Sequence, residues 1–509
     1  MHRLSLEQIE TITFEKTEFK IDNDTLERVS HSFRFLADFA QDKIIYGINT
    51  GFGPMAQFKI EKEELNQLQY NLIRNHSCGM GKPLEEVYAR SVLLARLNAF
   101  LQGNSGVSLN VVEKLIAFLN KNITPQIFEH GGVGASGDLV QLAHLGLNLI
   151  GEGKMYKDGK STDASDVLEA AQIEPLKLQL RDGLAIINGT SCMTGIAAIN
   201  LIYAYRLLNW SIASSSIINE IMSSFSDSFS EGLNNTKLHK GQQFVASEMR
   251  EFLKGSKLIR NREELFSDQS EFNRVEFKNR IQEYYSIRCV PQILGPIVDT
   301  LDNVKDIVEN EFNSTNDNPV VIPEHENVFH GGNFHGDYIS LEMDKLKIVM
   351  TKLSMLAERQ LNFLMNDRLN NKFPPFLNSG KLGLNFGFQG LQFTATSTTA
   401  ENQALSNSVY VHSIPNNKDN QDIVSMGTNS ASMTKQVIDN CFQVMAIHIM
   451  AVCQAIDLLK EGEKERLSEK TMKTYELIRN IAPFTKEDSA QSKVMNDVYN
   501  FIKNNKFEL

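Results

Sequence analysis

The chain of 509 residues has a formal net charge of −11, with 42% hydrophobic and 22% charged residues, as in an ordinary globular protein. This negative charge, without a compensating basic stripe, argues against a nucleic-acid or anionic-membrane partner. The five cysteines form no C-x-x-C pair, which argues against a zinc knuckle or a disulfide framework and favours a reducing compartment. The first residues lack the apolar run of a signal peptide, so we expect a cytoplasmic location. Small, neutral or zwitterionic substrates remain open.

Residues 1 to about 60 mix short strand-like and helical pieces and contain a glycine cluster, Tyr46 to Gly53, which reads Tyr-Gly-Ile-Asn-Thr-Gly-Phe-Gly. A loop so rich in glycine could close over a substrate as a lid. A tyrosine phenol has a reference pKa of about 10, so Tyr46 can act as a base only if its neighbours lower that value. A buried tyrosine beside a turn is the alternative interpretation. Helical patterns follow over residues 62–75 and 85–101.

A second glycine-rich stretch is denser, with four glycines between Gly131 and Gly137. Residues Gly132 to Gly137 match the nucleotide-binding pattern G-x-G-x-x-G, which requires a buried parallel strand before it and a βαβ unit around it. Residues 123–130 contain a proline and several polar side chains and make a poor parallel strand. We expect a helix from Asp138, as its cap, to Leu149, but no alternation of strands and helices follows. A nucleotide-dependent oxidoreductase is therefore the less favoured alternative.

The same stretch allows a chemical interpretation in which Ala135, Ser136 and Gly137 react with one another. If a turn presses the Gly137 nitrogen onto the Ala135 carbonyl carbon, the backbone can close a five-membered ring and lose water. Loss of the Ser136 hydroxyl as a second water leaves an exocyclic methylidene group, which is an electrophile. Alanine is small, glycine has no Cβ in the way, and the serine hydroxyl can be eliminated. The alternative is a glycine-rich helix N-terminus with a buried serine in a noncatalytic helical scaffold.

Downstream, residues 151–164 predict a hairpin that turns at Asp158-Gly159. From about residue 193 the sequence is dominated by long helical patterns, over residues 194–222, 238–253, 298–312, 338–365 and 430–459. Their apolar faces exceed what one short bundle can cover, so we expect a mainly α-helical protein whose bundle core is shared between subunits. We place one domain boundary, between a smaller mixed N-terminal region (1–205) and a long-helix core (206–509). Polar residues within the longest apolar stretch favour a buried helix over a membrane span.

Polar residues outside the glycine clusters are further candidates for a site. Arg288 follows Tyr285 by three positions, so on a helical turn the two share a face, and a guanidinium can bind a carboxylate through two hydrogen bonds. Most arginines are solvated surface charges, and the polar turns at Asn188 and Asn318 have turn chemistry as their alternative. No metal is expected, because a standard ligand spacing is lacking even among His330, His335 and Asp337.

Seven segments occur in the order seen in one enzyme family: Tyr46 to Gly53, Gly134 to Leu139, Asn188 to Thr190, Tyr285 to Arg288, Asp317 to Pro319, Gly332 to His335, and Ser425 to Gly427. With them the chain resembles the aromatic amino acid and histidine ammonia-lyases over nearly its whole length, and most closely the bacterial tyrosine ammonia-lyases. The resemblance implies a mainly α-helical homotetramer with active sites assembled from three subunits. It also implies a 4-methylidene-imidazol-5-one group made from Ala135-Ser136-Gly137, without a metal or a nucleotide.

The resemblance implies roles for single residues as well. Tyr46 would remove the β-proton of the substrate, and Arg288 would bind its carboxylate. Asn188 and Tyr285 would position the amine and the prosthetic ring. The other residues expected to line the pocket are Gly53, Asn318, Phe334 and Gln421.

Substrate choice depends on Asn75-His76 and on Gln421. Family members often carry Ser-His, His-Leu or Phe-Leu at the first position pair, so Asn75 is unusual. Asn75 or His76 could hydrogen-bond a phenol hydroxyl, whereas a phenylalanine ring would leave these groups unpaired. Gln421 stands where histidine enzymes typically carry glutamate, and a neutral amide suits a neutral aryl ring. We therefore expect elimination of ammonia from L-tyrosine to give trans-p-coumarate, with histidine ammonia-lyase, phenylalanine ammonia-lyase and tyrosine 2,3-aminomutase as alternatives.

Overall fold

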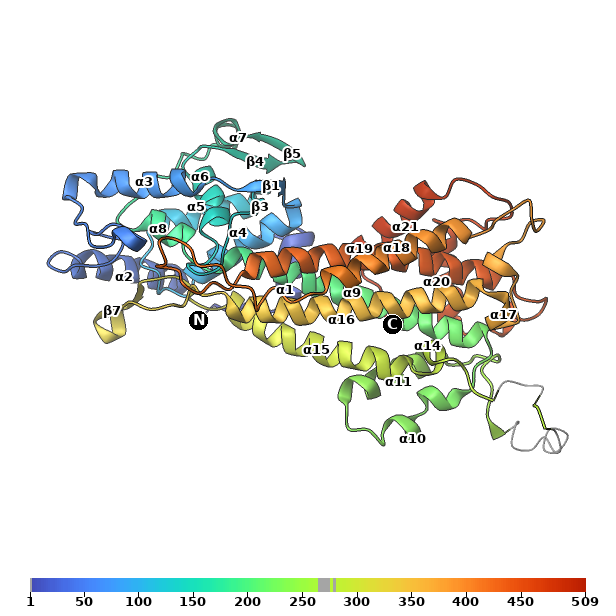
Figure 1. Ribbon diagram of the computed structural model, residues 1–509. Helices are drawn as coiled ribbons and strands as arrows, with labels where there is room; N and C mark the ends of the chain where they lie inside the picture. The colour runs from blue at the N-terminus through green and yellow to red at the C-terminus, as the bar shows by residue number, and fades with distance from the viewer. Residues whose placement is uncertain (1, 264–274, 278–280) are drawn as a thin grey trace. The chain divides into compact units, whose positions relative to one another are not determined.

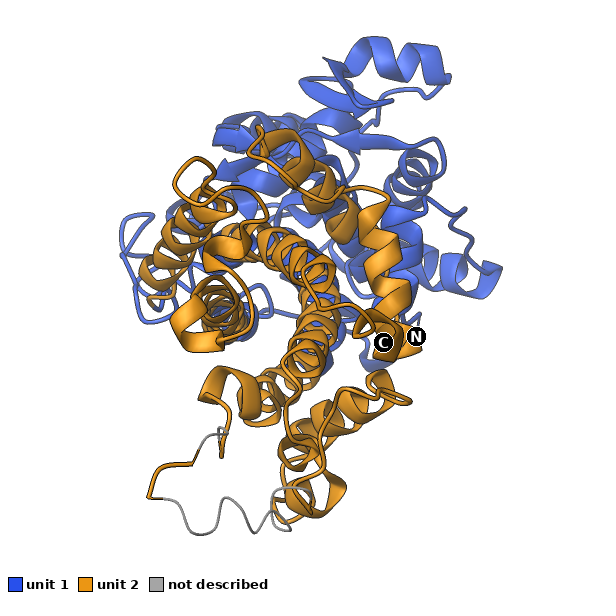
Figure 2. Cartoon of the chain, turned by 90° about the vertical axis from the view of Figure 1, so that its right-hand side faces the viewer, with its two compact units in different colours: residues 1–202, 304–345, 408–435 blue, residues 203–303, 346–407, 436–509 orange. Residues whose placement is uncertain are grey.

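The computed structural model describes residues 2–263, 275–277 and 281–509, and these residues are mainly α-helical, which confirms the predicted fold class (Figure 1). Three segments of the chain build each of two compact units (Figure 2). Unit 1 consists of Met1–Ile202, Val304–Lys345 and Ser408–Lys435. Unit 2 consists of Tyr203–Asn303, Leu346–Asn407 and Gln436–Leu509.

These units differ from a division into two continuous stretches, residues 1–205 and 206–509. The first boundary lies close to the expected one, but two later segments of the chain also belong to unit 1. The reason is that four long helices each contribute residues to both units: α9 (Ser191–Ile221), α15 (Val290–Phe312), α16 (Asp337–Met365) and α19 (Gly427–Asp457). A sequence boundary drawn where long helices begin cannot show that one helix serves two units.

Unit 1 contains eight shorter helices: α1 (Leu6–Phe14), α2 (Asn23–Phe39), α3 (Leu65–His76), α4 (Glu86–Phe100), α5 (Leu109–Asn120), α6 (Leu139–Leu149), α7 (Ala164–Ala171) and α8 (Asp182–Ile187). Its described strands are β1 (Met80–Pro83), β2 (Ile123–Pro125), β3 (Phe128–His130), β4 (Lys154–Lys157), β5 (Lys160–Asp163), β6 (Val320–Ile322) and β7 (Asn327–Phe329). They form small sheets with the strand orders β1-β3, β2-β4-β5 and β6-β7, and every pair is antiparallel.

The antiparallel pairing bears on the glycine-rich stretch. Strand β3 precedes that stretch and pairs with β1, while β2 belongs to a different sheet. A dinucleotide fold needs parallel strands joined by crossover helices, and the described strands provide no such unit. The G-x-G-x-x-G match therefore lies in the wrong structural context for a nucleotide site. The predicted hairpin is confirmed, because β4 and β5 turn at Asp158 and Gly159, which have φ angles of 51° and 74°.

Helix α4 forms the core of unit 1. Every residue from Tyr88 to Phe100 is buried, and the helix contacts α1, α5 and β2. Helices α3, α6 and α8 contact one another beside it. The buried stretch of α4 includes two arginines, Arg90 and Arg96, which is unusual because a buried guanidinium must find hydrogen-bond partners inside the protein.

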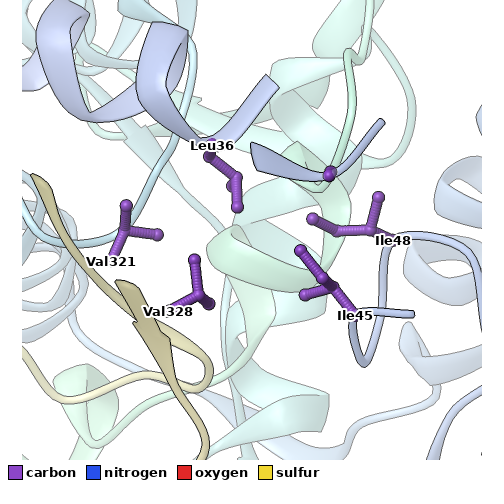
Figure 3. Packing of buried hydrophobic residues seen from close by; sticks show 6 residues of the cluster. Leu36, Ile45, Ile48, Val321 and Val328 are labelled. Atoms are coloured by element: carbon purple, nitrogen blue, oxygen red, sulfur yellow. The ribbon is translucent and has the colours of Figure 1, made fainter. Parts of the chain in front are cut away.

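A small hydrophobic cluster anchors the loop that carries Tyr46. Leu36 from α2 packs with Val321 of β6, Val328 of β7 and two loop residues, Ile45 and Ile48 (Figure 3). The two isoleucines flank the Tyr46-Gly47 dipeptide, so their burial fixes the backbone on either side of the tyrosine. The sequence suggests a loop that moves as a lid, but the start of this loop is fastened to the core.

Unit 2 contains helices α10 (Glu231–Asn234), α11 (Lys240–Phe252), α14 (Tyr285–Arg288), α17 (Asp367–Asn370), α18 (Gln389–Leu405), α20 (Glu469–Arg479) and α21 (Ser492–Asn504), besides its share of the long helices. The expected apolar seam of α16 is buried throughout, at Ile339, Met343, Leu346, Met350, Leu353 and Leu356. Helix α15 begins at Val290, eight residues before the expected start, with Pro291 in its first turn and Pro296 inside the helix. Proline disfavours a helix interior, so the sequence pattern did not indicate a helix over these residues.

Two helices, α9 and α19, are long and apolar enough to cross a membrane by length and composition alone. In the structure, 94% and 83% of their most apolar windows are buried within the protein. Core helices of globular proteins have the same properties, so these two helices are weak indicators of a membrane span.

The Ile45 anchor can be tested against its neighbour in the sequence. Ile45 is 2% exposed and Ile44 is 86% exposed. We expect Ile45→Ala to reduce the free energy of unfolding by about 2–5 kcal/mol, because it leaves a cavity in the cluster. Ile44→Ala should change it by less than about 0.5 kcal/mol. Urea unfolding followed by circular dichroism measures both variants, and equal shifts in the midpoint would contradict the anchoring role.

Candidate active site

The Ala135-Ser136-Gly137 turn lies between β3 and α6, and glycine backbones allow it to pack without side chains. Gly134 and Gly137 both have a φ angle of 72°. A Cβ on Gly137 would lie 2.1 Å from the Gly189 carbonyl oxygen, and a Cβ on Gly134 would lie 2.1 Å from Ser425 Oγ. A side chain at Gly137 would force the Gly189 backbone to move, and one at Gly134 would displace the Ser425 hydroxyl.

Residues Asn188 and Gly189, which follow α8, form a shelf beneath this turn. The Asp138 amide donates a hydrogen bond to the Gly189 carbonyl oxygen at 2.8 Å. Asn188 Nδ2 donates to the Ser136 carbonyl oxygen at 2.9 Å, while Asn188 Oδ1 accepts from the Asn318 amide at 2.8 Å. The Asn318 amide therefore fixes the orientation of the Asn188 side chain, and that side chain in turn fixes the Ser136 carbonyl.

The segment before α19 covers the turn on another side. Ser425 Oγ donates to the Gly134 carbonyl oxygen at 2.9 Å, and the Met426 amide donates to the Val133 carbonyl oxygen at 3.0 Å. Gln421 Nε2 donates to Ser136 Oγ at 2.8 Å. The carbonyl and the hydroxyl of Ser136 are thus bonded to amide side chains from two distant parts of the chain.

Asp138 is the N-cap residue of α6, as expected, and its backbone carbonyl oxygen accepts a hydrogen bond from the Leu142 amide at 2.9 Å. Its carboxylate makes no capping hydrogen bond to that helix. Instead its oxygens accept hydrogen bonds from the Met193 amide, at 2.8 Å, and from the Thr428 hydroxyl. Burial raises the pKa of this carboxyl to about 6 even though these hydrogen bonds favour the charged form. The predicted helix with Asp138 as its N-cap residue is therefore confirmed, while the carboxylate of that residue bonds to donors at the starts of α9 and α19 instead of to α6.

Tyr46 faces the same region from the anchored loop. Its hydroxyl accepts a hydrogen bond from the Gly53 amide at 3.0 Å, and its ring meets Phe52 edge to face. Burial raises the pKa of the phenol, and the Gly53 hydrogen bond offsets that only in part. A general base at neutral pH would require a lowered pKa. The surroundings of Tyr46 within unit 1 raise its pKa instead.

A pocket of about 400 Å³ opens beside Ser136. The site residues predicted from the sequence that line it are Tyr46, Gly53, Asn75, His76, Ser136, Asn188 and Gln421. The pocket is also lined by three asparagines that were not among the site residues predicted from the sequence: Asn71, Asn417 and Asn420. Asn71 lies one helical turn before Asn75 on α3, a spacing that could have revealed it. Among the described lining residues none is an aspartate, glutamate, lysine or arginine.

Two predicted pocket residues do not line this pocket. Asn318 supports Asn188 through its backbone amide, and its Oδ1 accepts a hydrogen bond from the Gly331 amide at 2.8 Å. Phe334 is half-buried in the segment that leads to α16. Nearby, His335 Nδ1 lies 3.3 Å from Asp337 Oδ2, and no group of three potential metal ligands occurs in the described part of the chain.

Tyr285 and Arg288 belong to unit 2, on the short helix α14. The Arg288 guanidinium lies over the Tyr285 ring at 4.8 Å, so the two residues share a face as their spacing predicts. Arg288 lines another pocket, of about 660 Å³, together with Asp227 and Glu283. Its Nε has no hydrogen-bond partner among the residues described, and the Tyr285 side chain is largely exposed.

The turn fits the five-membered prosthetic ring suggested by its sequence. Gly137 has no room for a Cβ, and the small side chain of Ala135 is buried. The serine hydroxyl that would leave as water faces the pocket and is bonded to Gln421, while the serine carbonyl is bonded to Asn188. Asn188 and Gln421 are thus the residues that contact the turn where such a group would form.

The contact between Gly137 and Gly189 can be tested with a matched glycine. Gly137 and Gly159 have φ angles of 72° and 74°, but nothing lies within 4 Å of a Cβ built on Gly159. We expect Gly159→Ala to cost about 1 kcal/mol of stability. Gly137→Ala should lower the thermal midpoint further and leave the turn uncyclised, as measured by calorimetry and intact mass spectrometry. Equal midpoints and equal masses for the two variants would contradict the close packing.

Comparisons with known proteins place the chain in a family. The family model described as "Aromatic amino acid lyase" matches residues 4–480. The chain is 37% identical over 505 residues to a tyrosine 2,3-aminomutase of Chondromyces crocatus, covering 98% of this chain and 94% of that one. It is 35% identical over 508 residues to a histidine ammonia-lyase of Caldanaerobacter subterraneus, covering 100% and 96%. The crystal structure of the tyrosine aminomutase from Streptomyces globisporus superposes with a TM-score of 0.94 at 34% identity, covering 99% and 95%. The chain therefore belongs to the aromatic amino acid lyase family.

Proposed function

We propose that the protein is a tyrosine ammonia-lyase, which eliminates ammonia from L-tyrosine to give trans-p-coumarate. The observation that carries this proposal is the lining of the pocket beside Ser136, in which amide and imidazole groups stand among apolar side chains such as Leu68, Leu72 and Leu139 and no carboxylate is present among the described residues. Asn75 and His76 can hydrogen-bond a phenol hydroxyl there, and Gln421 offers an amide rather than a carboxylate. An aryl ring with one hydroxyl matches this lining, whereas a phenylalanine ring would leave polar groups unpaired.

The prosthetic group proposed for this reaction is a 4-methylidene-imidazol-5-one derived from Ala135, Ser136 and Gly137. When formed, such a group is an electrophile for the substrate amine and makes that amine a better leaving group. The hydrogen bonds from Asn188 to the Ser136 carbonyl and from Gln421 to the Ser136 hydroxyl fix where the reactive carbon would face. One relative, from Streptomyces globisporus, is named an MIO-dependent tyrosine 2,3-aminomutase, where MIO stands for the methylidene-imidazolone group. This name supports the same chemistry here.

The substrate carboxylate needs a cation, and the described lining of the Ser136 pocket offers none. Arg288 is the candidate, because its guanidinium lines a pocket and retains an unpaired Nε. The family resemblance implies a homotetramer with active sites built from three subunits. We therefore propose that Arg288 and Tyr285 enter the site from a neighbouring subunit in a cytoplasmic homotetramer.

Removal of the β-proton is assigned to Tyr46. Its hydroxyl lines the pocket near Ser136, but burial raises the pKa of the phenol within unit 1. A cation placed nearby would favour the phenolate and lower that pKa. The proposed entry of Arg288 would thus serve both the binding of the carboxylate and the activation of Tyr46.

A second candidate function is tyrosine 2,3-aminomutase. It is favoured by the relatives of that name, which are 37% identical to this chain over 505 and 487 residues. An aminomutase would return the amine to the β-carbon, so its product would be β-tyrosine. The pocket lining is equally compatible with both products, because both reactions begin on the same substrate.

Product analysis tests the proposed function. Incubation with L-tyrosine should yield free ammonia and trans-p-coumarate in equal amounts, measured by chromatography with mass detection. Ser136→Ala should reduce this turnover by at least about 10³-fold, because the electrophile cannot form. Accumulation of β-tyrosine as the main product would favour the aminomutase, and full activity of Ser136→Ala would refute the proposed electrophile.

Substrate preference is tested by placing a carboxylate at one of two neighbouring positions. Gln421→Glu should lower kcat/KM for tyrosine by roughly 10-fold or more and raise it for histidine, because a carboxylate favours an imidazole over a neutral phenol. Asn420→Asp is the control, since Asn420 lines the same pocket without a hydrogen bond to Ser136. Absorbance assays with tyrosine, phenylalanine and histidine give the ratios. Unchanged ratios in Gln421→Glu would remove this residue from substrate selection.

A further inference from the structure

Arg96 of α4 is buried in a way that stability alone does not explain. Its side chain is fully buried, and its Nη1 donates a hydrogen bond to the Asn188 carbonyl oxygen at 2.9 Å. Its Nε and Nη2 have no hydrogen-bond partner among the described residues. A buried charge with unpaired donors destabilises a fold, and an apolar residue of similar size would often serve stability better. Burial lowers the pKa of the guanidinium to about 10, so it stays charged at neutral pH.

The guanidinium packs directly against the shelf that supports the reactive turn. A Cβ on Gly189 would lie 2.2 Å from Arg96 Nη1 and 2.6 Å from Asn316 Oδ1. Gly189 is therefore enclosed between the arginine and the residues before the Asn318-Pro319 bond. The Arg96 hydrogen bond to the Asn188 carbonyl fixes the peptide that joins Asn188 to Gly189.

The two residues joined by that peptide each make one hydrogen bond to the turn. Asn188 Nδ2 donates to the Ser136 carbonyl oxygen, and the Gly189 carbonyl oxygen accepts from the Asp138 amide. The Gly189 backbone also lies where a Cβ of Gly137 would be. Residues 136–138 are thus bonded at both ends to Asn188 and Gly189, and Arg96 donates a hydrogen bond to the peptide that joins these two residues.

Closure of the five-membered ring from Ala135, Ser136 and Gly137 requires that the backbone of the turn be held in place. The Gly137 nitrogen forms a bond to the Ala135 carbonyl carbon, and the Ala135 oxygen leaves as water with the protons of the Gly137 and Ser136 amide nitrogens. The Ser136 hydroxyl then leaves as a second water with the proton of its own Cα. No oxidant or reductant is needed. The attack depends on holding two backbone atoms of the same chain in contact, so orientation is the main requirement on the protein.

We propose that Arg96 is a positioning residue for the cyclisation of Ala135-Ser136-Gly137. It acts through the Asn188-Gly189 peptide and does not touch the reacting atoms. This inference rests on the proposed function, because it concerns the formation of the prosthetic group that the lyase would use. The charged, planar guanidinium is suited to the task, since a charge-assisted hydrogen bond holds a carbonyl more firmly than a neutral one.

Arg90, six residues earlier on α4, provides a matched control. It is also fully buried, but its Nε and Nη1 donate to the carbonyl oxygens of Ile12 and Leu119, each at 3.0 Å. Those carbonyls belong to α1 and α5 and have no contact with the turn in the structure described. Arg90 and Arg96 thus share a helix, a charge and a degree of burial, and they differ in what they hold.

The test is to produce the full chain and the variants Arg96→Met and Arg90→Met by cell-free synthesis, and to follow intact mass over time in the folded fraction from gel filtration. The wild-type chain and Arg90→Met should become two water masses lighter than their sequences. In folded Arg96→Met the loss of the two waters should be at least tenfold slower than in folded Arg90→Met. Equal rates of loss in folded Arg96→Met and Arg90→Met would overturn the inference, because loss of fold alone would act only in the unfolded fraction.

Arg96→Lys keeps the inference testable if Arg96→Met does not fold. Lysine retains the charge but lacks the planar fork, so water loss should be at least threefold slower than in the wild-type chain, and water loss at the wild-type rate would overturn the inference. A wild-type chain that retains both waters would instead refute the proposed function itself. Ammonia release per cyclised chain should be similar in the wild type and Arg96→Lys, since the inference concerns formation of the group.

Discussion

The close contact between the backbones of Gly137 and Gly189 is the constraint on which the site depends. No side chain fits between them, so the strand-to-helix turn and the shelf after α8 meet directly. This contact brings the side-chain amide of Asn188 to the Ser136 carbonyl oxygen and aligns the backbone amide of Asp138 with the Gly189 carbonyl oxygen. It also places the Asp138 carboxylate in a buried position, where its pKa rises and where donors from two long helices are needed to satisfy it.

The pocket beside this turn combines apolar side chains with amide groups and contains no lysine, arginine, aspartate or glutamate among its described lining residues, and that determines which parts of a substrate it can recognise. Amide groups can hydrogen-bond a hydroxyl or an amine, but among the described lining residues no cation is available for a carboxylate. An amino acid substrate would therefore be only partly recognised by unit 1. The unpaired Nε of Arg288 is the complementary feature, a cation that lines a pocket and lacks a full set of partners. The two observations together give a physical reason for the shared sites that the family resemblance implies.

Many helices and the hairpin could be predicted from the sequence. The tertiary contacts that support the reactive turn could not. Helical periodicity placed α4 and α16 within one residue at each end, and turn chemistry gave the hairpin at Asp158-Gly159. The start of α15 was missed because Pro291 and Pro296 suppress the helical signal. The hydrogen bonds of the Asp138 carboxylate could not be foreseen, because its donors lie 55 and 290 positions away. Arg96 gave no signal at all, since an arginine in an apolar helix looks like a surface charge until its neighbours in space are known.

The residues that pack against the turn are synthesised much later than the turn itself. Ser425 donates to Gly134 from 291 positions downstream, and the Gly336 amide donates to the same carbonyl. A growing chain on the ribosome therefore contains the Ala-Ser-Gly sequence long before it contains the residues that pack against it. The turn can reach its final packing only after most of the polypeptide has been made and folded. If the proposed ring closure depends on that packing, incomplete chains would keep both waters, and the loss of two waters would serve as a permanent record that a given molecule had folded.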